Sequence, residues 1–135
     1  MKMIKLFIII ILPVFIGCQS DSIKGNCSAV HLTTELTTLT SIELFSVQEV
    51  KVAGNTLTIQ FAYGGGCDPD HKFELYLQPL PSTSLSAFEG RVVFTTKDPC
   101  KRLDTKEFCF DLTELKSKYP SGSINIRGFK EPVVF

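Results

Sequence analysis

Hydrophobic residues recur at every second position in several short segments of this chain, and this spacing constrains the fold more than any other feature. The clearest segment places Leu57, Ile59, Phe61 and Tyr63 on one side, with polar or small residues between them. Residues two positions apart point to the same face of a β-strand, so each such segment is predicted to be a strand with one buried face. Strands are predicted over residues 46–52, 57–63, 73–78, 91–96, 105–112, 123–127 and 132–135.

The succession of short strands predicts an all-β fold. Turn signals at residues 53–56 and 120–122 separate neighbouring strands. This pattern is typical of a small antiparallel β-sandwich or barrel, with an immunoglobulin-like outline as one alternative. At most one short helix is expected, over residues 112–119. Residues 31–45 stay ambiguous, because leucines three or four apart favour a helix whereas the run of β-branched threonines favours a strand.

The N-terminal segment has a different character from the rest of the chain. Residues 6–16 are hydrophobic without interruption, and Lys2 and Lys5 precede them. As a helix this segment would span roughly 16 Å, about half of a bilayer's hydrocarbon core, so it is too short for a membrane-spanning helix. A positive start, a short hydrophobic segment and a small residue before a cut site are typical of a secretory signal peptide.

The end of this segment, residues 14–18 with the sequence VFIGC, resembles the lipobox of bacterial lipoproteins. The resemblance implies that Cys18 is lipidated and becomes the mature N-terminus, anchored to a membrane of the bacterial cell envelope. We expect the outer membrane rather than the inner one. The alternatives are a signal peptide followed by an incidental cysteine, or a cytosolic protein with a hydrophobic N-terminus. The predicted parts are a lipoprotein signal peptide at 1–17, the lipidated cysteine and a tether at 18–30, and a single β domain at 31–135.

The charge balance excludes some classes of partner. The whole chain has 14 basic and 14 acidic residues. Two of the lysines belong to the signal peptide, so the mature part is slightly acidic. Such a composition excludes a polybasic nucleic-acid binder, and no glycine-rich loop opens a helix as it does in nucleotide-binding proteins. We therefore expect no nucleic-acid partner and no cofactor.

Four cysteines remain when the lipidated one is set aside, and an exported protein meets conditions in which disulfides form. Three pairings are open to four cysteines. The alternation within residues 107–112 points Cys109 away from the core, whereas Cys67 and Cys100 lie in loops with turn-forming residues. The sequence therefore favours a disulfide between Cys67 and Cys100, and a second one that joins Cys27 to Cys109 across an outer face.

The most distinctive pattern combines several short motifs. A Gly-Gly-Cys at residues 65–67 precedes His71 and a Phe-Glu-Leu strand, and an Asp-x-Cys at 98–100 precedes an Asp-Leu at 111–112. This order resembles small uncharacterised lipoproteins and exported proteins of Bacteroidetes-type bacteria, over roughly residues 47–127. The resemblance implies a family and no particular activity. In that group a second His often precedes the Asp-x-Cys, whereas this chain has threonines and a lysine there, so a two-His site is not implied.

Metal binding is one hypothesis for this pattern. Cys67 and His71 are four positions apart, and Cys100 would complete the ligand set if the two loops meet. Thiolate and imidazole groups with short spacers are common in zinc and copper sites. The competing interpretation is that Cys67 and Cys100 form a disulfide, whose sulfur atoms are poor ligands.

Catalysis has little support in the sequence. The chain has two histidines, His31 and His71, and it lacks the Gly-x-Ser-x-Gly turn of serine hydrolases. Cys67 with His71 is the one candidate pair of thiol and base, and it would require a reduced thiol. We therefore predict that the protein is not an enzyme.

Two functions follow as hypotheses. The first is a non-enzymatic, lipid-anchored β domain that binds an envelope protein, a glycan or another envelope component. The second is a metal-binding or metal-handling lipoprotein that uses Cys67, His71 and Cys100. The candidate contacts for the first hypothesis are two aromatic residues and a basic cluster, namely Tyr76, Phe88, Lys97, Lys101, Arg102 and Lys106.

Overall fold

The structure is a computed structural model that describes residues 26–41, 44–67, 71–81 and 86–135. The predicted signal peptide and the lipidated Cys18 lie outside these residues. The described part contains eight strands and one short helix. In chain order they are β1 (Ser28–Leu32), β2 (Phe45–Ala53), β3 (Thr56–Gly64), β4 (His71–Leu80), β5 (Ser86–Thr96), β6 (Leu103–Asp111), α1 (Thr113–Lys118), β7 (Gly122–Ile126) and β8 (Val133–Val134).

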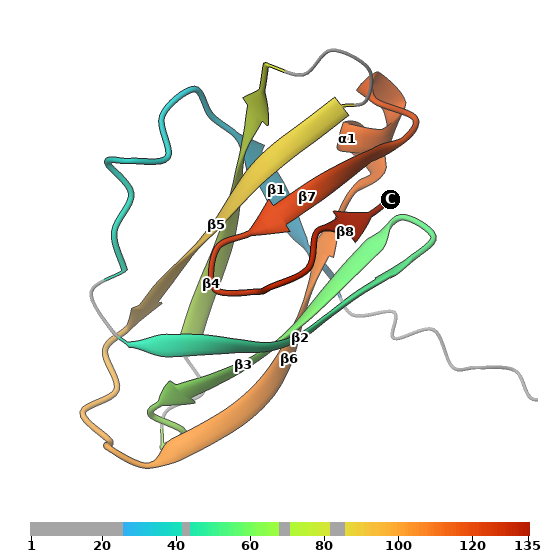
Figure 1. Cartoon of the computed structure of the whole chain (residues 1–135). Coiled ribbons are helices and arrows are strands. Elements are labelled where there is room, and N and C mark those ends of the chain that lie inside the picture. Colours follow the sequence, from blue (N-terminus) through green and yellow to red (C-terminus); the bar gives the residue numbers. More distant parts are fainter. Residues whose placement is uncertain (1–25, 42–43, 68–70, 82–85) are drawn as a thin grey trace, which may run out of the picture.

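All eight strands belong to one sheet that curls into a nearly closed barrel (Figure 1). The strand order is β2-β3-β6-β1-β4-β5-β7-β8, and the first and last strands of this order approach each other. Helix α1 lies at one end of the barrel, which we call the helix end. The opposite end, where β3 and β5 finish and β4 and β6 begin, we call the loop end. The predicted all-β fold with one short helix is confirmed.

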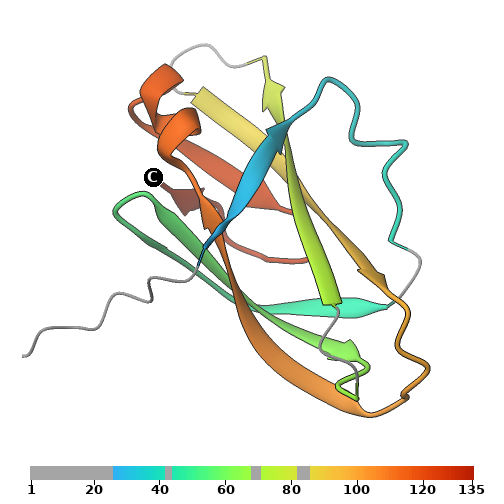
Figure 2. The ribbon, with the colours of Figure 1, turned by 180° about the vertical axis from the view of Figure 1, so that it is seen from behind.

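The sheet is mixed rather than wholly antiparallel. The hairpins β2-β3 and β4-β5 and the pairs β3-β6 and β7-β8 are antiparallel, as predicted. In contrast, β1 runs parallel to both of its neighbours, β4 and β6, and β5 runs parallel to β7. Figure 2 shows β1 crossing between β4 and β6 on the back of the barrel. One curled eight-stranded sheet thus replaces the two antiparallel sheets of an immunoglobulin-like outline.

Strand β1 was not predicted, and it changes the domain boundary. Its residues are mostly exposed and show no buried alternation, so the hydrophobic spacing does not reveal it. It nevertheless begins at Ser28, directly after Cys27, which is bonded to Cys109 of β6. The β domain therefore includes residues that the sequence assigned to the tether at 18–30. The ambiguous stretch 31–45 contains the end of β1 and no helix among its described residues.

The alternating residues of the central strands form the hydrophobic core. In β3, Leu57, Ile59, Phe61 and Tyr63 are buried to 1% exposure or less, as the spacing predicted. Aromatic rings dominate the part of the core near the loop end. The ring of Phe73 stacks on Phe61 at 4.2 Å and on Phe94 at 4.4 Å between centroids. Close aromatic packing of this kind stabilises a small core beyond the area that it buries.

Strands β4 and β5 extend by several residues beyond the predicted ranges 73–78 and 91–96. Strand β4 continues through Pro79, beyond the point where β1 ends opposite Leu77. From there β4 has a neighbour on one side only, and a proline is tolerated at such an edge. Strand β5 begins at Ser86 rather than 91. Gly90 lies on the buried face of β5 between Phe88 and Val92, where a Cβ would lie 3.1 Å from side-chain atoms of β4 and β7. Because glycine has no side chain, it leaves a gap in the hydrophobic spacing of the sequence.

Candidate functional site

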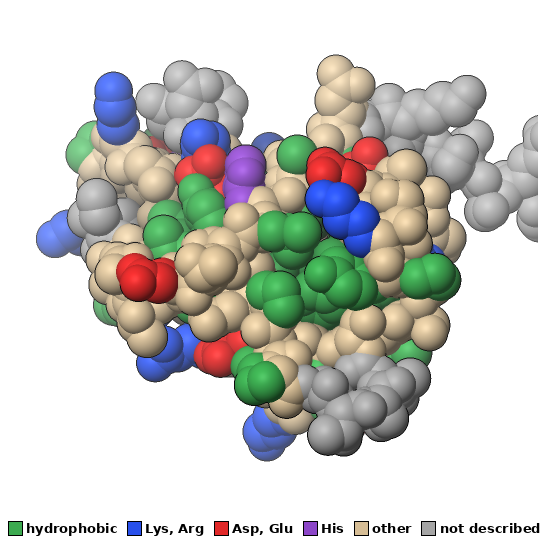
Figure 3. Space-filling view, turned by 90° about the horizontal axis from the view of Figure 1, so that it is seen from above, with side chains coloured by type: hydrophobic (Ala, Val, Ile, Leu, Met, Phe, Trp, Pro, Cys, Tyr) green, Lys and Arg blue, Asp and Glu red, His purple; other side chains and the backbone are tan. Residues whose placement is uncertain are grey.

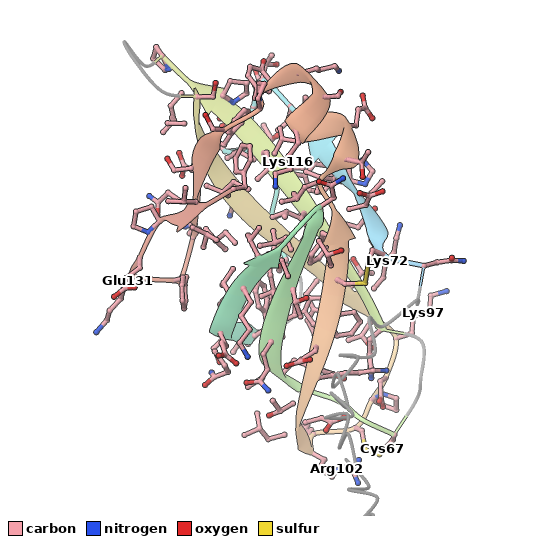
Figure 4. All side chains as sticks on the ribbon, turned by 90° about the vertical axis from the view of Figure 1, so that its right-hand side faces the viewer. Cys67, Lys72, Lys97, Arg102, Lys116 and Glu131 are labelled. Carbon is pink, nitrogen blue, oxygen red and sulfur yellow. A yellow bond between two sulfur atoms is a disulfide. The ribbon has the colours of Figure 1, made fainter. Side chains whose placement is uncertain are left out.

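The loop end of the barrel carries the motif residues that the sequence singled out. Cys67 follows β3 and Cys100 precedes β6, and a disulfide joins the two with their Cα atoms 5.9 Å apart. This pairing, and that of Cys27 with Cys109, is the one that the strand phase favoured. Figure 4 shows Cys67 and Arg102 together at this end, where the Arg102 guanidinium donates a 2.8 Å hydrogen bond to the carbonyl of Gly66.

Asp98 holds the two halves of the disulfide in place. Its side chain is completely buried. Its Oδ2 accepts a 2.9 Å hydrogen bond from the backbone N–H of Cys67, and its Oδ1 accepts a 2.8 Å bond from the N–H of Cys100. One carboxylate thus fixes both cysteine backbones. Asp98 was not predicted as a site residue, and the short Asp-Pro-Cys spacing is the one signal of its role in the sequence.

His71 opens β4 and lies against the same carboxylate. Its side chain is 3% exposed, and its Nε2 atom is 3.9 Å from Oδ2 of Asp98. The other ring nitrogen, Nδ1, is 3.0 Å from the hydroxyl of Thr96, which also accepts a hydrogen bond from the N–H of Asp98. Among the described residues, Nε2 itself has no hydrogen-bond partner. The structure therefore places Cys67, Cys100 and Asp98 within one cluster of possible ligand atoms, and His71 borders that cluster through Asp98.

Tyr63 closes the cluster from the core side. Its ring packs edge-on against His71 at 4.9 Å between centroids. Burial raises the pKa of the Tyr63 hydroxyl, and the nearby carboxylates of Asp104 and Asp98 raise it further. Although Asp104 is close enough to act on this pKa, the hydroxyl makes no hydrogen bond of good geometry within the described structure. The cluster thus contains two buried polar atoms without partners.

Glycines allow the loop after β3 to lie on this cluster. Gly65 and Gly66 have φ angles of +141° and +86°. A Cβ at Gly65 would lie 3.0 Å from the His71 ring, and one at Gly66 would lie 2.8 Å from Oδ2 of Asp104. Both the backbone angles and the close approach therefore require glycine.

A groove at the helix end is the second candidate site. Strand β1 pairs with β6 through Ser28 and Ala29 and then separates from it, because the chain of β6 turns into α1. In the described structure no strand pairs with this side of β1 beyond Ala29. A hollow of about 320 Å³ lies there between β1 and α1. Its lining residues are Ala29, Val30, His31, Leu32, Asp111, Glu114, Leu115 and Lys118.

The groove continues into a hydrophobic surface at the helix end. Leu32 also borders an adjoining hollow that Thr33, Thr34 and Pro79 line. Leu32 is 42% exposed and Leu80 is 40% exposed. Seen from above the barrel, hydrophobic side chains gather in the middle of the face, with charged side chains around them (Figure 3). This end therefore combines an open strand edge with exposed hydrophobic side chains.

The other predicted contact residues have mixed positions. The prediction for Phe88 was wrong, because its side chain is 1% exposed and packs against Tyr119 and Phe135 in the core. Tyr76 lies on the outer face of β4, where its ring stacks on His31 at 5.0 Å between centroids. In the predicted basic cluster, Lys97, Lys101 and Arg102 lie in the loop between β5 and β6 at the loop end, and Lys106 lies in β6. Within the described part of the chain, no helix is long and hydrophobic enough to cross a membrane.

No protein-family profile and no curated protein matches this chain. Its fold is similar to that of a protein of unknown function, DUF1344, from Bacteroides vulgatus, with a TM-score of 0.50 and 11% sequence identity over 81% of this chain. A protein from Parabacteroides distasonis, described as toxin-related, gives a TM-score of 0.43 with 13% identity over 81% of this chain. The chain covers 56% and 59% of the lengths of these two proteins. The first likeness shows a shared fold with an uncharacterised protein of the bacterial group that the sequence motifs indicated.

Proposed function

We propose that this protein is a lipoprotein of the bacterial cell envelope, anchored through Cys18, and that its β domain is a non-enzymatic binding module. The single observation that carries the binding role is the open edge of β1 in the groove beside α1. Unpaired backbone N–H and C=O groups of a strand edge are a template for another extended segment. The proposed ligand is an extended, partly hydrophobic segment of an envelope protein.

The chemistry of the groove supports a peptide rather than a glycan. Added strands gain affinity from main-chain hydrogen bonds and specificity from pockets for alternate side chains. Here the edge of β1 offers the hydrogen bonds, and the hollows on either side of Leu32 offer two such pockets. The pocket between β1 and α1 contains a charged pair, because Lys118 forms a 3.1 Å ion pair with Glu114. A segment with alternating hydrophobic and polar residues fits both features.

The absence of catalysis is part of the proposal and rests on the states of the candidate residues. A cysteine nucleophile needs a thiolate, and Cys67 is bonded to Cys100. His31 is half exposed, stacks on the ring of Tyr76 and lies 3.9 Å from the carboxylate of Glu74, and neither of these groups is a usual nucleophile. In the oxidised protein, Cys67 is therefore not available as the nucleophile of a thiol enzyme.

The anchor is tested by metabolic labelling of the full chain with a radioactive fatty acid in a bacterial host. The wild-type protein is expected to incorporate label and to sediment with membranes. The Cys18→Ser variant is expected to lose the label, because the acyl chains need the thiol. A Cys27→Ser variant is the matched control and should still be labelled. Continued labelling of Cys18→Ser would contradict the anchor.

The binding role is tested with a photo-crosslinking amino acid at one of two exposed positions of the full chain in living cells. Position 32 lies in the groove, whereas Lys51, which is 61% exposed, lies on β2 away from it. Position 32 is expected to give a discrete protein adduct, mapped by mass spectrometry to an extended segment, and position 51 is expected to give none. Equal adducts at both positions, or none at position 32, would reject the groove as the binding surface.

A further inference from the structure

The loop end contains an arrangement of donor atoms that the proposed binding role does not use. The sulfur atoms of Cys67 and Cys100 and a carboxylate oxygen of Asp98 lie within 4.8 Å of one another. Next to them, Nε2 of His71 is buried, lacks a hydrogen-bond partner among the described residues and is 3.9 Å from Oδ2 of Asp98. A buried histidine nitrogen without a partner is costly unless something binds it.

We propose that this cluster is a redox-gated zinc site. In the oxidised protein the two cysteines form the disulfide and the site is closed to metal. When the disulfide is reduced, the thiolates of Cys67 and Cys100, a carboxylate oxygen of Asp98 and Nε2 of His71 bind one Zn²⁺ ion. Zinc suits this set because it accepts sulfur, nitrogen and oxygen ligands in tetrahedral geometry.

The proposed site requires the ligand atoms to move closer to one another and the two sulfur atoms to separate. A tetrahedral ion with Zn–S bonds of about 2.3 Å and Zn–N or Zn–O bonds of about 2.0 Å places its ligand atoms roughly 3.3 to 3.8 Å apart. The Nε2 to Oδ2 separation of 3.9 Å is already close to that range. Opening the disulfide lets the two sulfur atoms move apart from bonding distance to ligand distance. Both cysteines lie in loops, so this movement leaves the strands in place.

The surroundings of the cluster orient the ligands. In the proposed site the Nδ1–H of His71 donates to the hydroxyl of Thr96, 3.0 Å away, which leaves the lone pair of Nε2 for the metal. Metal-binding histidines usually donate their second ring N–H in this way, which fixes the tautomer. The backbone N–H groups of Cys67 and Cys100 hold the Asp98 carboxylate in turn. Gly65 lets the loop close over His71 without a Cβ in the way.

The gating step is a thiol–disulfide exchange. A dithiol reductant gives two electrons and two protons to the Cys67–Cys100 disulfide, and its own two thiols become a disulfide. Zinc binding then displaces one proton from each cysteine thiol. The reductant is proposed to be an exported dithiol protein, and a water-soluble phosphine replaces it in the experiment. This site is independent of the groove at the helix end, so either proposal can fail without the other.

The test uses the purified full chain in detergent, with Co²⁺ as a spectroscopic probe and Zn²⁺ as its competitor. Phosphine-reduced protein is expected to bind one Co²⁺ with an absorption band from thiolate-to-metal charge transfer, and Zn²⁺ is expected to abolish the band. Untreated protein is expected to show no such band. A reduced protein with four titratable thiols and no charge-transfer band would overturn the proposal.

The zinc affinities of single-residue variants identify which side chains bind the metal. The His71→Gln and Asp98→Asn variants are each expected to bind Zn²⁺ at least about 100-fold more weakly when reduced, and Thr96→Val about 10-fold more weakly, because outer partners of ligands typically contribute 10- to 100-fold. His31→Gln is the matched control and should bind like the wild type. Equal affinities for His71→Gln and His31→Gln would exclude His71 as a ligand and overturn the site.

A second measurement covers the case in which reduction unfolds the domain. Circular dichroism of the reduced wild type is followed on heating, with and without Zn²⁺. Zinc is expected either to raise the unfolding temperature or to restore the β-sheet spectrum, because metal binding at a site absent from the unfolded chain favours the folded state. The Cys67→Ser/Cys100→Ser variant is expected to show neither effect. An identical response of this variant and the reduced wild type would also overturn the site.

Discussion

The hydroxyl group of Tyr63 is a single buried atom whose removal tests the polar cluster at the loop end. It has no hydrogen-bond partner among the described residues, although the side chain is 1% exposed. A buried polar group in this state costs about 1 to 3 kcal/mol. The Tyr63→Phe variant is therefore expected to keep the free energy of unfolding unchanged or to raise it by about 1 kcal/mol, measured by urea unfolding at pH 7.

The control for this substitution is Tyr76→Phe on the outer face of β4, which is expected to change the free energy of unfolding by less than about 0.5 kcal/mol. A loss of more than about 1 kcal/mol in Tyr63→Phe, with Tyr76→Phe unchanged, would mean that the hydroxyl has a partner, such as a buried water. Such a partner would bridge Tyr63 to the carboxylate of Asp104 or Asp98.

Tyr63 also predicts how stability depends on alkaline pH. Burial, and then the Asp104 and Asp98 carboxylates, raise the pKa of Tyr63 above the ordinary value of 10.0. The unfolded chain therefore loses this proton first as the pH rises. The contribution of the neutral hydroxyl is fully present below pH 10.0 and is lost as the pH rises through the higher folded pKa.

The measurement is the free energy of unfolding of wild type and Tyr63→Phe at pH 8 to 11. The wild type is expected to lose more stability than the variant above about pH 10, because Tyr63→Phe has no proton to lose at this position. Parallel curves for the two proteins over that interval would contradict the raised pKa.

At the scale of the elements, Gly122 determines how β7 packs against β5. It begins β7 and exchanges two backbone hydrogen bonds with Phe135, of 3.2 and 3.0 Å. A Cβ at Gly122 would collide with the carbonyl oxygen of Ser86, which belongs to the backbone of β5 and has little freedom to move. We expect Gly122→Ala to lower the free energy of unfolding by about 1 to 3 kcal/mol, since overpacking forces backbone shifts.

Gly64, at the end of β3, offers the matched control for that substitution. A Cβ there meets nothing within 4 Å, and its φ angle is not in the positive range. Gly64→Ala is therefore expected to be neutral or to stabilise by about 0.4 to 1 kcal/mol, because alanine restricts the unfolded chain. Chemical denaturation of both variants tests the pair, and an equal effect of the two would show that the contact with Ser86 is not the cause.

The elements also show what the sequence could predict. Strand β3 was predicted almost to the residue because one of its faces is buried, and burial on one face produces an alternating pattern. The β2-β3 register shifts between Val47 and Glu49. This shift matches the sequence, in which Val50 and Val52 alternate out of phase with Val47. Strand β1 was not predicted because it has no buried face that would produce such a pattern. Its side chains are mostly exposed, and what holds it is backbone pairing to two strands that are distant in sequence.

The site was predicted in part for similar reasons. Strand phase indicated that Cys109 faces outward, and turn residues indicated that Cys67 and Cys100 lie in loops. The role of Asp98 depends on two backbone N–H groups that meet only when the loop after β3 lies against the loop after β5. Phe88 was misplaced because Gly90, the next residue on the same face of β5, has no side chain, so the hydrophobic spacing is recognisable only from Val92 onward. The hydrogen bonds of Asp98 join two loops, so they leave no periodic signal in the sequence.

At the scale of the whole molecule, the two disulfides close loops of different lengths. Cys27 and Cys109 are 82 positions apart, whereas Cys67 and Cys100 are 33 apart. By loop-closure entropy alone, these crosslinks stabilise the folded state by about 4.5 and 3.7 kcal/mol. The Cys27→Ala/Cys109→Ala variant is expected to lose more stability than Cys67→Ala/Cys100→Ala. Urea unfolding of the two variants and the wild type measures the difference.

Hydrogen exchange extends this comparison to single strands. Loss of the Cys27–Cys109 bond is expected to increase amide exchange in β1 before it does so in the core strands, because β1 contributes few buried side chains. Loss of the Cys67–Cys100 bond should leave β1 protected. A variant that lacks Cys27 and Cys109 but keeps full protection in β1 would show that backbone pairing alone holds this strand.

The disulfide between Cys27 and Cys109 has a mechanical consequence for a domain attached through its N-terminus. A pulling force that arrives along the chain from Cys18 reaches Cys27 before it reaches β1. Through the covalent bond, the load passes to the middle of the barrel wall, into β6, which is paired with β3 along its whole length. The five residues of β1 are thereby spared from being unzipped one hydrogen bond at a time. Under tension between the proposed membrane anchor and a segment bound in the proposed groove, the barrel is expected to resist as one unit.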